Sequence, residues 1–215
     1  MKYKLTKNKK TIGDVTLYQI EALKDFSDIK KGDLGGWIEK ESNLSQQGNC
    51  WVTGCARISG SAMVCDNAQV SSNAMVSGNA IVSGNARVSG NAIVSGNARV
   101  SGNARVFGNA RVSDNAWVFG NARVFGKARV FGNARVFGNV RVFDNSQVYG
   151  DARVSGDAWV SGDAIVCDNA QVSGDARVSG DAWVSGNVRV FGNARVSGNV
   201  RVYGDAEISG NAIIN

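Results

Sequence analysis

The sequence predicts an all-β solenoid, in which short strands wind repeatedly around one long axis. A unit close to VSGNAR repeats from Val52 onward, and steps of six residues reach Ile214 through 28 hexads without a slip. Within each unit an Ala or another small residue stands two positions before a Val, which is the alternation of a strand with one face turned inward. A short and strict internal period of this kind is typical of repeat architectures.

The hexad also contains the residues that form the corners between the strands. Each Val and its following residue lead into Gly or Asp and then Asn or Asp, and these residue types tolerate left-handed backbone and can turn a corner. Six residues therefore suit one short side of a polygon. The pattern resembles the hexapeptide-repeat family. That resemblance implies a triangular, left-handed parallel β-helix with three hexads, or 18 residues, in each coil.

Residues 1–33 do not follow the hexad and predict a small N-terminal β cap on a helix formed by residues 34–215. Alternation in KYKL and in TLYQIEAL indicates two strands, joined by the basic segment TKNKKTIGD as a turn. A solenoid exposes its first core layer unless something covers it. Ile38 and Leu44 extend the hexad phase backward, so we expect about ten coils. At ~4.8 Å per coil, the prism would be about 48 Å tall.

The segment from Asp25 to Trp51 contains a distinctive set of residues, which are Asp25, Phe26, Asp28, Gly32, Gly35, Gly36, Trp37, Leu44, Ser45, Gln46, Gln47, Gly48, Cys50 and Trp51. In these residues it resembles the opening of the YdcK-like hexapeptide-repeat proteins, a group found in enteric bacteria and on prophages and often labelled as transferases. The resemblance implies the fold, and it suggests a phage-borne accessory role acting on a host protein.

Composition limits the remaining function classes. No apolar run approaches the ~20 residues needed to cross a membrane, and the N-terminus lacks the apolar stretch of a signal peptide, so we expect a cytoplasmic location. The four cysteines show no CxxC spacing and the chain has no histidine, which predicts no metal site and no cofactor. Cys65 and Cys167 occupy the outward slot after a Val, where Ser, Phe and Tyr also occur.

If three hexads close a coil, residues 18 apart stack on one face and form outward columns. Charge is sorted along these columns, because eight arginines and Lys127 oppose only Asp114 between Val82 and Phe143, whereas aspartates dominate from Asp144 to Ala182. The candidate ligand- or partner-binding residues are Arg87, Arg105, Arg123 and Arg141 with Phe107, Phe125 and Phe143, together with Arg111, Arg129 and Arg135 on the other faces.

The favoured interpretation is a rigid, non-catalytic prism that binds a protein or assembles with itself, because a row of exposed aromatics is costly in a soluble monomer. A homodimer would form end to end through Ile213 and Ile214 of the last coil, or through the charged faces; a monomer with a frayed end is the alternative. Nucleic-acid or nucleotide binding at the arginines and phenylalanines is a second hypothesis. Mechanical copying of one hexad also explains the columns.

Acyl transfer is a further alternative. Hexapeptide-repeat acyltransferases use a histidine as general base and a loop that shapes the pocket. This chain has no histidine, and after Gln46 and Gln47 it has no inserted loop. A carboxylate would have to serve as base, yet the acidic residues stand at corners that we expect to be solvated. The sequence therefore predicts no catalytic residues and a protein that is not an enzyme.

Overall fold

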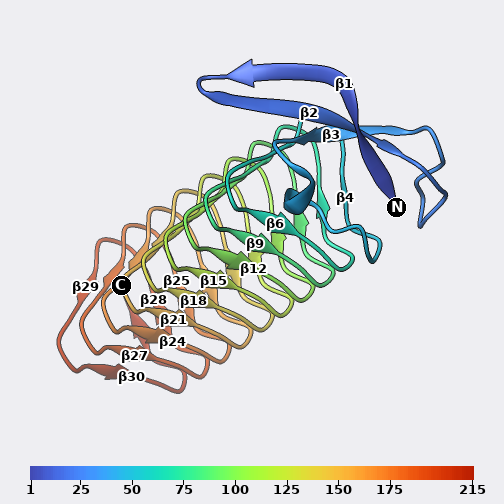
Figure 1. Ribbon diagram of the computed structural model, residues 1–215. Coiled ribbons are helices and arrows are strands. Elements are labelled where there is room, and N and C mark those ends of the chain that lie inside the picture. The colour runs from blue at the N-terminus through green and yellow to red at the C-terminus, as the bar shows by residue number, and fades with distance from the viewer.

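The computed structural model describes residues 1–215 as a left-handed parallel β-helix of about ten coils with about 18 residues each, crossed at its N-terminal end by a β-hairpin (Figure 1). The predicted fold class is confirmed. Nearly every hexad supplies one two-residue strand, and strands three hexads apart pair in parallel, as Arg105 with Arg123. None of the helices is long and apolar enough to span a membrane.

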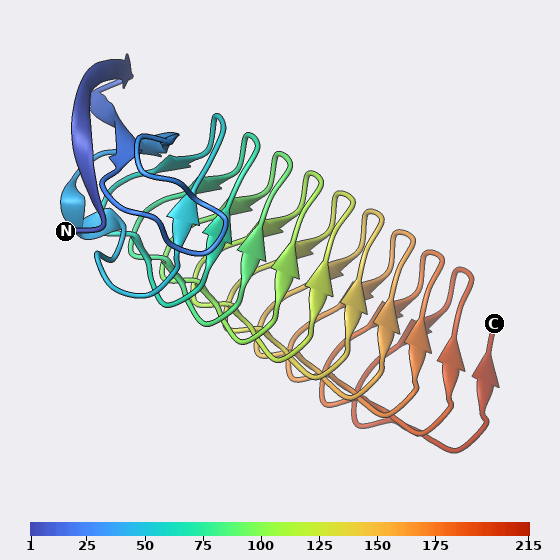
Figure 2. The same ribbon diagram turned by 90° about the vertical axis from the view of Figure 1, so that its right-hand side faces the viewer.

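Three sheets form the three faces of the prism. Face 1, which Figure 2 turns toward the viewer, contains β4 (Trp51–Val52), β7 (Gln69–Val70), β10 (Arg87–Val88), β13 (Arg105–Val106), β16 (Arg123–Val124), β19 (Arg141–Val142), β22 (Trp159–Val160), β25 (Arg177–Val178), β28 (Arg195–Val196) and β31 (Ile213–Ile214). Face 2 contains β1 (Tyr3–Ile12), β2 (Val15–Ala22), β3 (Leu34–Ile38), β5 (Arg57–Ile58), β8 (Met75–Val76), β11 (Ile93–Val94), β14 (Arg111–Val112), β17 (Arg129–Val130), β20 (Gln147–Val148), β23 (Ile165–Val166), β26 (Trp183–Val184) and β29 (Arg201–Val202). Face 3 contains β6 (Met63–Val64), β9 (Ile81–Val82), β12 (Arg99–Val100), β15 (Trp117–Val118), β18 (Arg135–Val136), β21 (Arg153–Val154), β24 (Gln171–Val172), β27 (Arg189–Val190) and β30 (Glu207–Ile208).

The hexad makes one side of the triangle because its two small apolar residues both point inward. Ala122 and Val124 are fully buried, and the same two positions are buried in most coils. The corner needs a residue with positive φ, and Gly126 supplies it at φ +70°. A Cβ on Gly126 would lie 2.9 Å from the backbone nitrogen of Asp144, one coil further on. Glycine therefore satisfies both the turn and the close stacking of successive corners.

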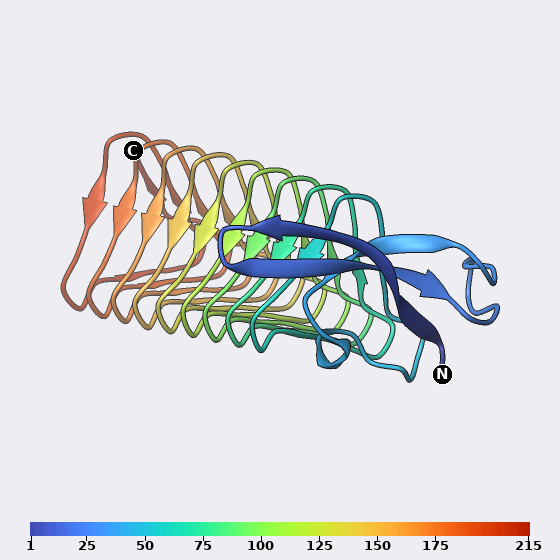
Figure 3. The same cartoon turned by 45° about the horizontal axis from the view of Figure 1, so that its top comes forward.

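The N-terminal hairpin departs from its prediction. The segment TKNKKTIGD was expected to be a turn, but β1 continues through it to Ile12 and only Gly13 and Asp14 form the turn. Pairing with β2 explains the difference, because Lys9 lies opposite Tyr18 and Lys10 opposite Leu17. The hairpin lies over the first coils (Figure 3).

The chain around the first coil contains a buried lysine. Lys2 is 1% exposed, and its Nζ donates to the Cys50 carbonyl at 2.8 Å and to Cys50 Sγ at 3.2 Å. Tyr3 donates its hydroxyl hydrogen toward the carbonyls of Glu41, in the short 3-10 helix η1 (Glu41–Asn43), and of Leu44. These contacts join the N-terminus to the start of the solenoid.

The last coil is more open than the rest. Ile213 is 61% exposed and Tyr203 is 74% exposed, whereas the inward residues of the middle coils are fully buried. Ile214 packs partly against the core. End-to-end pairing through Ile213 and Ile214 stays a prediction.

Candidate functional site on face 1

The four predicted arginines of face 1 form one column along the solenoid axis. Arg87 pairs with Arg105, Arg105 with Arg123, and Arg123 with Arg141, each in the adjacent coil. All four side chains are exposed. Beyond them the column continues with Trp159, Arg177, Arg195 and Ile213.

The phenylalanines next to this column stack on one another and make no cation–π contact with the arginines of the column. The Phe107 and Phe125 rings are parallel, with centroids 4.9 Å apart, and Phe125 and Phe143 repeat the arrangement at 5.0 Å. The arginines of this column contact tryptophan instead. Arg141 and Arg177 are the two neighbours of Trp159 in the column, and the guanidinium carbon of each lies 4.8 Å from the centroid of its ring. The phenylalanine faces therefore contact one another and not the arginines of this column.

The other predicted arginines do not join this site. Arg111 and Arg129 are consecutive rungs of face 2, and Arg135 lies on face 3, where it contacts the Trp117 ring at 5.3 Å. Aromatic pairs accompany them, with Phe131 and Tyr149 stacked at 4.8 Å. The predicted arginines therefore surround the prism, and a ligand on face 1 contacts only some of them.

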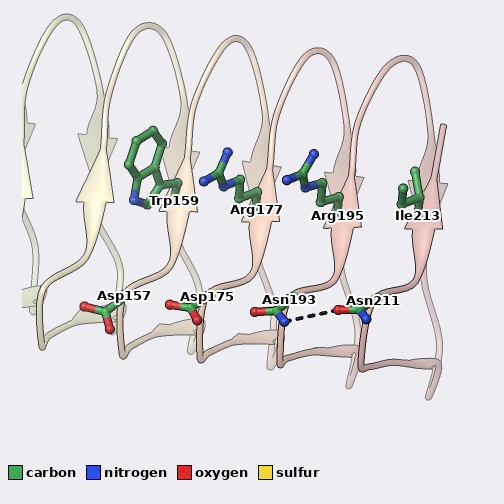
Figure 4. A pocket seen from close by; sticks show the side chains of 8 residues that line it. All are labelled: Asp157, Trp159, Asp175, Arg177, Asn193, Arg195, Asn211 and Ile213. Atoms are coloured by element: carbon green, nitrogen blue, oxygen red, sulfur yellow. Dashed lines mark hydrogen bonds between the residues drawn. The ribbon is translucent and has the colours of Figure 1, made fainter.

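Two hollows follow face 1, between the arginine column and a column of corner residues. The first, of about 380 Å³, is lined by Asn103, Arg105, Asn121, Arg123, Asn139 and Arg141. The second, of about 640 Å³, is lined by Asp157, Trp159, Asp175, Arg177, Asn193, Arg195, Asn211 and Ile213 (Figure 4). They adjoin, because Asn139 Nδ2 donates to Asp157 Oδ1 at 2.7 Å. We call the two together the face-1 groove.

The corner column explains why the two hollows differ. From Asn67 each amide donates to the next residue 18 positions on, in an unbroken ladder that ends at Asp157. An ionised carboxylate accepts hydrogen bonds but donates none, so Asp157 cannot continue the ladder to Asp175. The ladder resumes only with Asn193, which donates to Asn211 at 3.1 Å. Asp175 is left with no side-chain hydrogen bond.

The charged groups of the second hollow are not paired with one another. The only ion pairs in the protein lie in the N-terminal region, between Lys4 and Glu21 and between Lys30 and Asp25. Asp157, Asp175, Arg177 and Arg195 thus carry charges that no ion pair neutralises. Figure 4 shows the carboxylates and guanidiniums in two separate rows.

Sequence reasoning placed none of the residues of this second hollow in a binding site, apart from Ile213 as a dimer contact. The available signal was the replacement of Asn by Asp at positions 157 and 175 of one corner column. It went unused because corner aspartates were interpreted as solvated turn residues.

Cys167 also differs from its prediction as an outward residue. It is 2% exposed, and Trp183 Nε1 donates a hydrogen bond to its sulfur at 3.3 Å. Burial raises the pKa of the Cys167 thiol, and burial also raises the pKa of the neighbouring Tyr149 to about 12. Cys167 therefore packs between two coils of face 2.

The comparisons with known proteins match the repeat. The family model described as the YdcK β-solenoid repeat matches residues 68–84, 82–96, 86–102, 92–106, 98–114, 104–119, 128–144, 134–150, 146–162, 170–186 and 194–206, which together cover more than half of the chain. The chain is 51% identical over 39 residues to the protein of Escherichia coli K12 named "Uncharacterized acetyltransferase YdcK". That match covers 18% of this chain and 12% of the relative.

A solved structure shares the fold. The UDP-N-acetylglucosamine acyltransferase of Francisella novicida is 14% identical, with a TM-score of 0.50 over 74% of this chain and 66% of that one. The Arabidopsis enzyme of the same name is 13% identical, with a TM-score of 0.36 over 80% and 70% of the two chains.

These comparisons correct the functional interpretation of the sequence. The expectations of a non-catalytic interaction module, and of a protein that is not an enzyme, are overturned by the relative named as an acetyltransferase. That interpretation depended on the missing histidine and on corner carboxylates that were expected to be solvated, and neither argument excludes a carboxylate as the general base.

Proposed function

This chain belongs to the YdcK β-solenoid repeat family, and from that premise we propose that it is an acyltransferase. It moves an acyl group from a thioester donor to a hydroxyl or amine of an acceptor, and the reaction takes place in the second hollow of the face-1 groove. The relative's name gives the reaction type. The observation that carries the placement is the coexistence there of two carboxylates and two guanidiniums without an ion pair among them.

Asp175 is the candidate general base. No side chain donates a hydrogen bond to its carboxylate, whereas Asp157 accepts one from Asn139. In the proposed step the acceptor oxygen or nitrogen attacks the acyl carbon while Asp175 takes its proton. The carbon–sulfur bond then breaks, and Asp175 returns the proton to the leaving thiolate. A positioned base of this kind contributes roughly 10²–10⁴-fold to a rate.

Arg177 and Arg195 are the candidate donor-binding residues. They occupy adjacent rungs of face 1 and are both exposed toward the hollow. Guanidinium groups bind phosphate in bidentate fashion, which suits a donor such as acetyl-coenzyme A that carries phosphates at a distance from its thioester. These residues therefore affect donor binding more than the chemical step.

The test is thiol release from acetyl-coenzyme A with a panel of hydroxyl and amine acceptors. The Asp175→Asn variant should lower kcat by at least about 100-fold, while Arg177→Gln should mainly raise KM for the donor. Asp181→Asn is the matched control, because Asp181 occupies the same coil at the next corner and lies outside the groove. Equal rates in the Asp175→Asn and Asp181→Asn proteins would contradict the assignment, and so would no release with any acceptor.

A further inference from the structure

A recess of about 260 Å³ lies between the N-terminal hairpin and the first coils of face 2, on the side where the hairpin crosses the solenoid (Figure 3). Five of the eight residues that line it are apolar, and the hairpin contributes Ile12, Val15 and Leu17. Ile12 is 44% exposed, so part of this apolar surface has no cover. None of the lining residues belongs to the face-1 groove. We call this space the hairpin recess.

Arg57 lines the hairpin recess without a strong hydrogen-bond acceptor. Its Nη2 reaches only the sulfur of Met75, at 3.5 Å, and a thioether is a weak acceptor. Its Nε is shielded from solvent and has no partner. Neither of the two ion pairs in the protein includes Arg57. A buried N–H without a partner keeps its full desolvation penalty, which an oxygen atom of a ligand would remove.

A second cation, Lys10, lies close to Arg57. Its Nζ is 4.1 Å from the centroid of the Trp37 ring, and Trp37 pairs with Arg57 in the adjacent strand. Burial lowers the pKa of Lys10 and the charge of Arg57 lowers it further, while Cys55 acts in the opposite direction. No carboxylate lines the recess. The two cations therefore create a positive potential that a bound anion would neutralise.

The two kinds of lining select an occupant with two parts. An inorganic anion on Arg57 would leave the apolar residues of the hairpin facing water, and an uncharged apolar molecule would leave the guanidinium unpaired. An oxyanion accepts two parallel hydrogen bonds from a guanidinium, and Ser59 and Ser77 line the same recess with hydroxyls that can also donate. The volume is below the ~300–1,000 Å³ of typical drug-sized sites, which limits the apolar part to a short chain.

We infer that the hairpin recess binds a small amphiphilic anion, with its oxyanion head on Arg57 and its short apolar chain against Ile12, Val15 and Leu17. The head displaces the Met75 sulfur and accepts hydrogen bonds from Nε and Nη2 of Arg57. Methionine side chains are flexible and apolar, so Met75 can turn toward the chain of the ligand. A carboxylate and a phosphate monoester present the same acceptor oxygens to the guanidinium. This binding is independent of the acyl transfer proposed for face 1.

Calorimetric titration of the full chain with octanoate and with octyl phosphate, at neutral pH and low ionic strength, tests the inference. Octanol supplies the chain without the charge, whereas acetate and inorganic phosphate supply the charge without the chain. At least one of the two octyl anions should bind about tenfold or more tightly than each of these three compounds. Tighter binding of octanoate would support a carboxylate ligand, and tighter binding of octyl phosphate would support a phosphate monoester.

Two matched variants locate the binding. Arg57→Met should weaken binding of the octyl anion by about tenfold or more, because it removes the charged donors. Arg111→Met makes the same change three rungs further along the same column of face 2, and its Kd should stay within about twofold of the unmodified protein. Arg57→Met should also keep or raise the melting temperature, because it removes a buried N–H that has no partner.

Four results would overturn the inference. They are no binding of either octyl anion, equally tight binding of octanol, acetate or phosphate, equal weakening by Arg57→Met and Arg111→Met, and a lower melting temperature for Arg57→Met than for Arg111→Met. The last result would mean that the Arg57 side chain supports the packing of the hairpin and is not held ready for a ligand.

Discussion

The two halves of face 1 share one backbone and one core but differ in their outward side chains. In the coils of Arg105, Arg123 and Arg141 the corner column is an amide ladder and the aromatic rings stack in parallel. In the coils of Trp159 and Arg177 the corner carries aspartate, the slot after Val carries serine, and the ladder is broken. The inward positions are buried in both halves and hold the same residues, except that Val140 replaces Ala in the coil of Arg141.

The difference shows how a uniform scaffold can carry a local site. An asparagine both donates and accepts, so a column of them satisfies itself from coil to coil. Two successive aspartates stop the ladder and leave the carboxylate of Asp175 without a side-chain hydrogen bond. Because the interior does not change, the outward side chains can change without a cost in core packing. Four substitutions, ordered by expected effect, test this comparison.

The largest effect should follow from joining the two halves of the ladder. Replacing both Asp157 and Asp175 with Asn should abolish the proposed acyl transfer by at least about 100-fold, while the melting temperature stays the same or rises because the amides now pair throughout. Thiol-release kinetics and thermal denaturation measure the two quantities. The control is Asp163→Asn with Asp181→Asn in the same coils. A loss of activity that accompanies unfolding would contradict a role in chemistry.

Removing one ring from the basic half should come next. Phe125→Ser gives that coil the residue found at Ser161 in the acidic half, and it removes two stacked contacts. Such contacts contribute roughly 0.5–1.5 kcal/mol each, so the free energy of unfolding should fall by about 2 kcal/mol in urea titrations. Ser161→Ala should change it by less than about 0.5 kcal/mol. Equal changes in the free energy of unfolding for the two variants would show that the stacked rings do not stabilise the protein.

Breaking the ladder where it is intact should have a smaller effect. Asn121→Ala removes the hydrogen bonds with Asn103 and Asn139. A typical hydrogen bond contributes roughly 0.5–1.5 kcal/mol net, and because both of these are exposed to water we expect a combined loss of about 1 kcal/mol. Asp175→Ala in the broken section should leave stability nearly unchanged. Urea titration of both proteins compares them directly, and a larger loss at Asp175 would invert the interpretation.

Neutralising one arginine should give the smallest effect, with opposite signs in the two halves. Arg123→Gln relieves repulsion from Arg105 and Arg141 and should stabilise the protein by ~0.3 kcal/mol at low salt. The gain should vanish at high ionic strength. Arg177→Gln loses the contact with Trp159 and should destabilise it by roughly 0.5 kcal/mol. The same sign in both variants would mean that charge sorting does not affect stability.

Much of the fold could be predicted from the sequence, because the hexad is itself a structural unit. The alternation of Ala and Val and the positive-φ Gly follow from period and residue type. The 18-residue stacking of Arg105 on Arg123 was expected from the resemblance to the hexapeptide-repeat family, and the structure has it. The hairpin turn was misplaced because the lysines of TKNKKTI look like a loop until β2 pairs with them. The Asp157 and Asp175 site escaped notice because its signal is the loss of a hydrogen-bond ladder that exists only between coils.

The sequence by itself determined the solenoid and its six-residue period, and the family resemblance added the three hexads per coil that place residues in columns. Those properties depend on local sterics and on which side chains are apolar, and both can be read along the chain. Only the tertiary structure decided which columns form a groove, that the phenylalanines stack on each other while tryptophan receives the arginines, and that Asp175 is left without a donor. Each depends on the orientation of side chains 18 residues apart, and orientation is fixed by neighbouring coils rather than by the hexad.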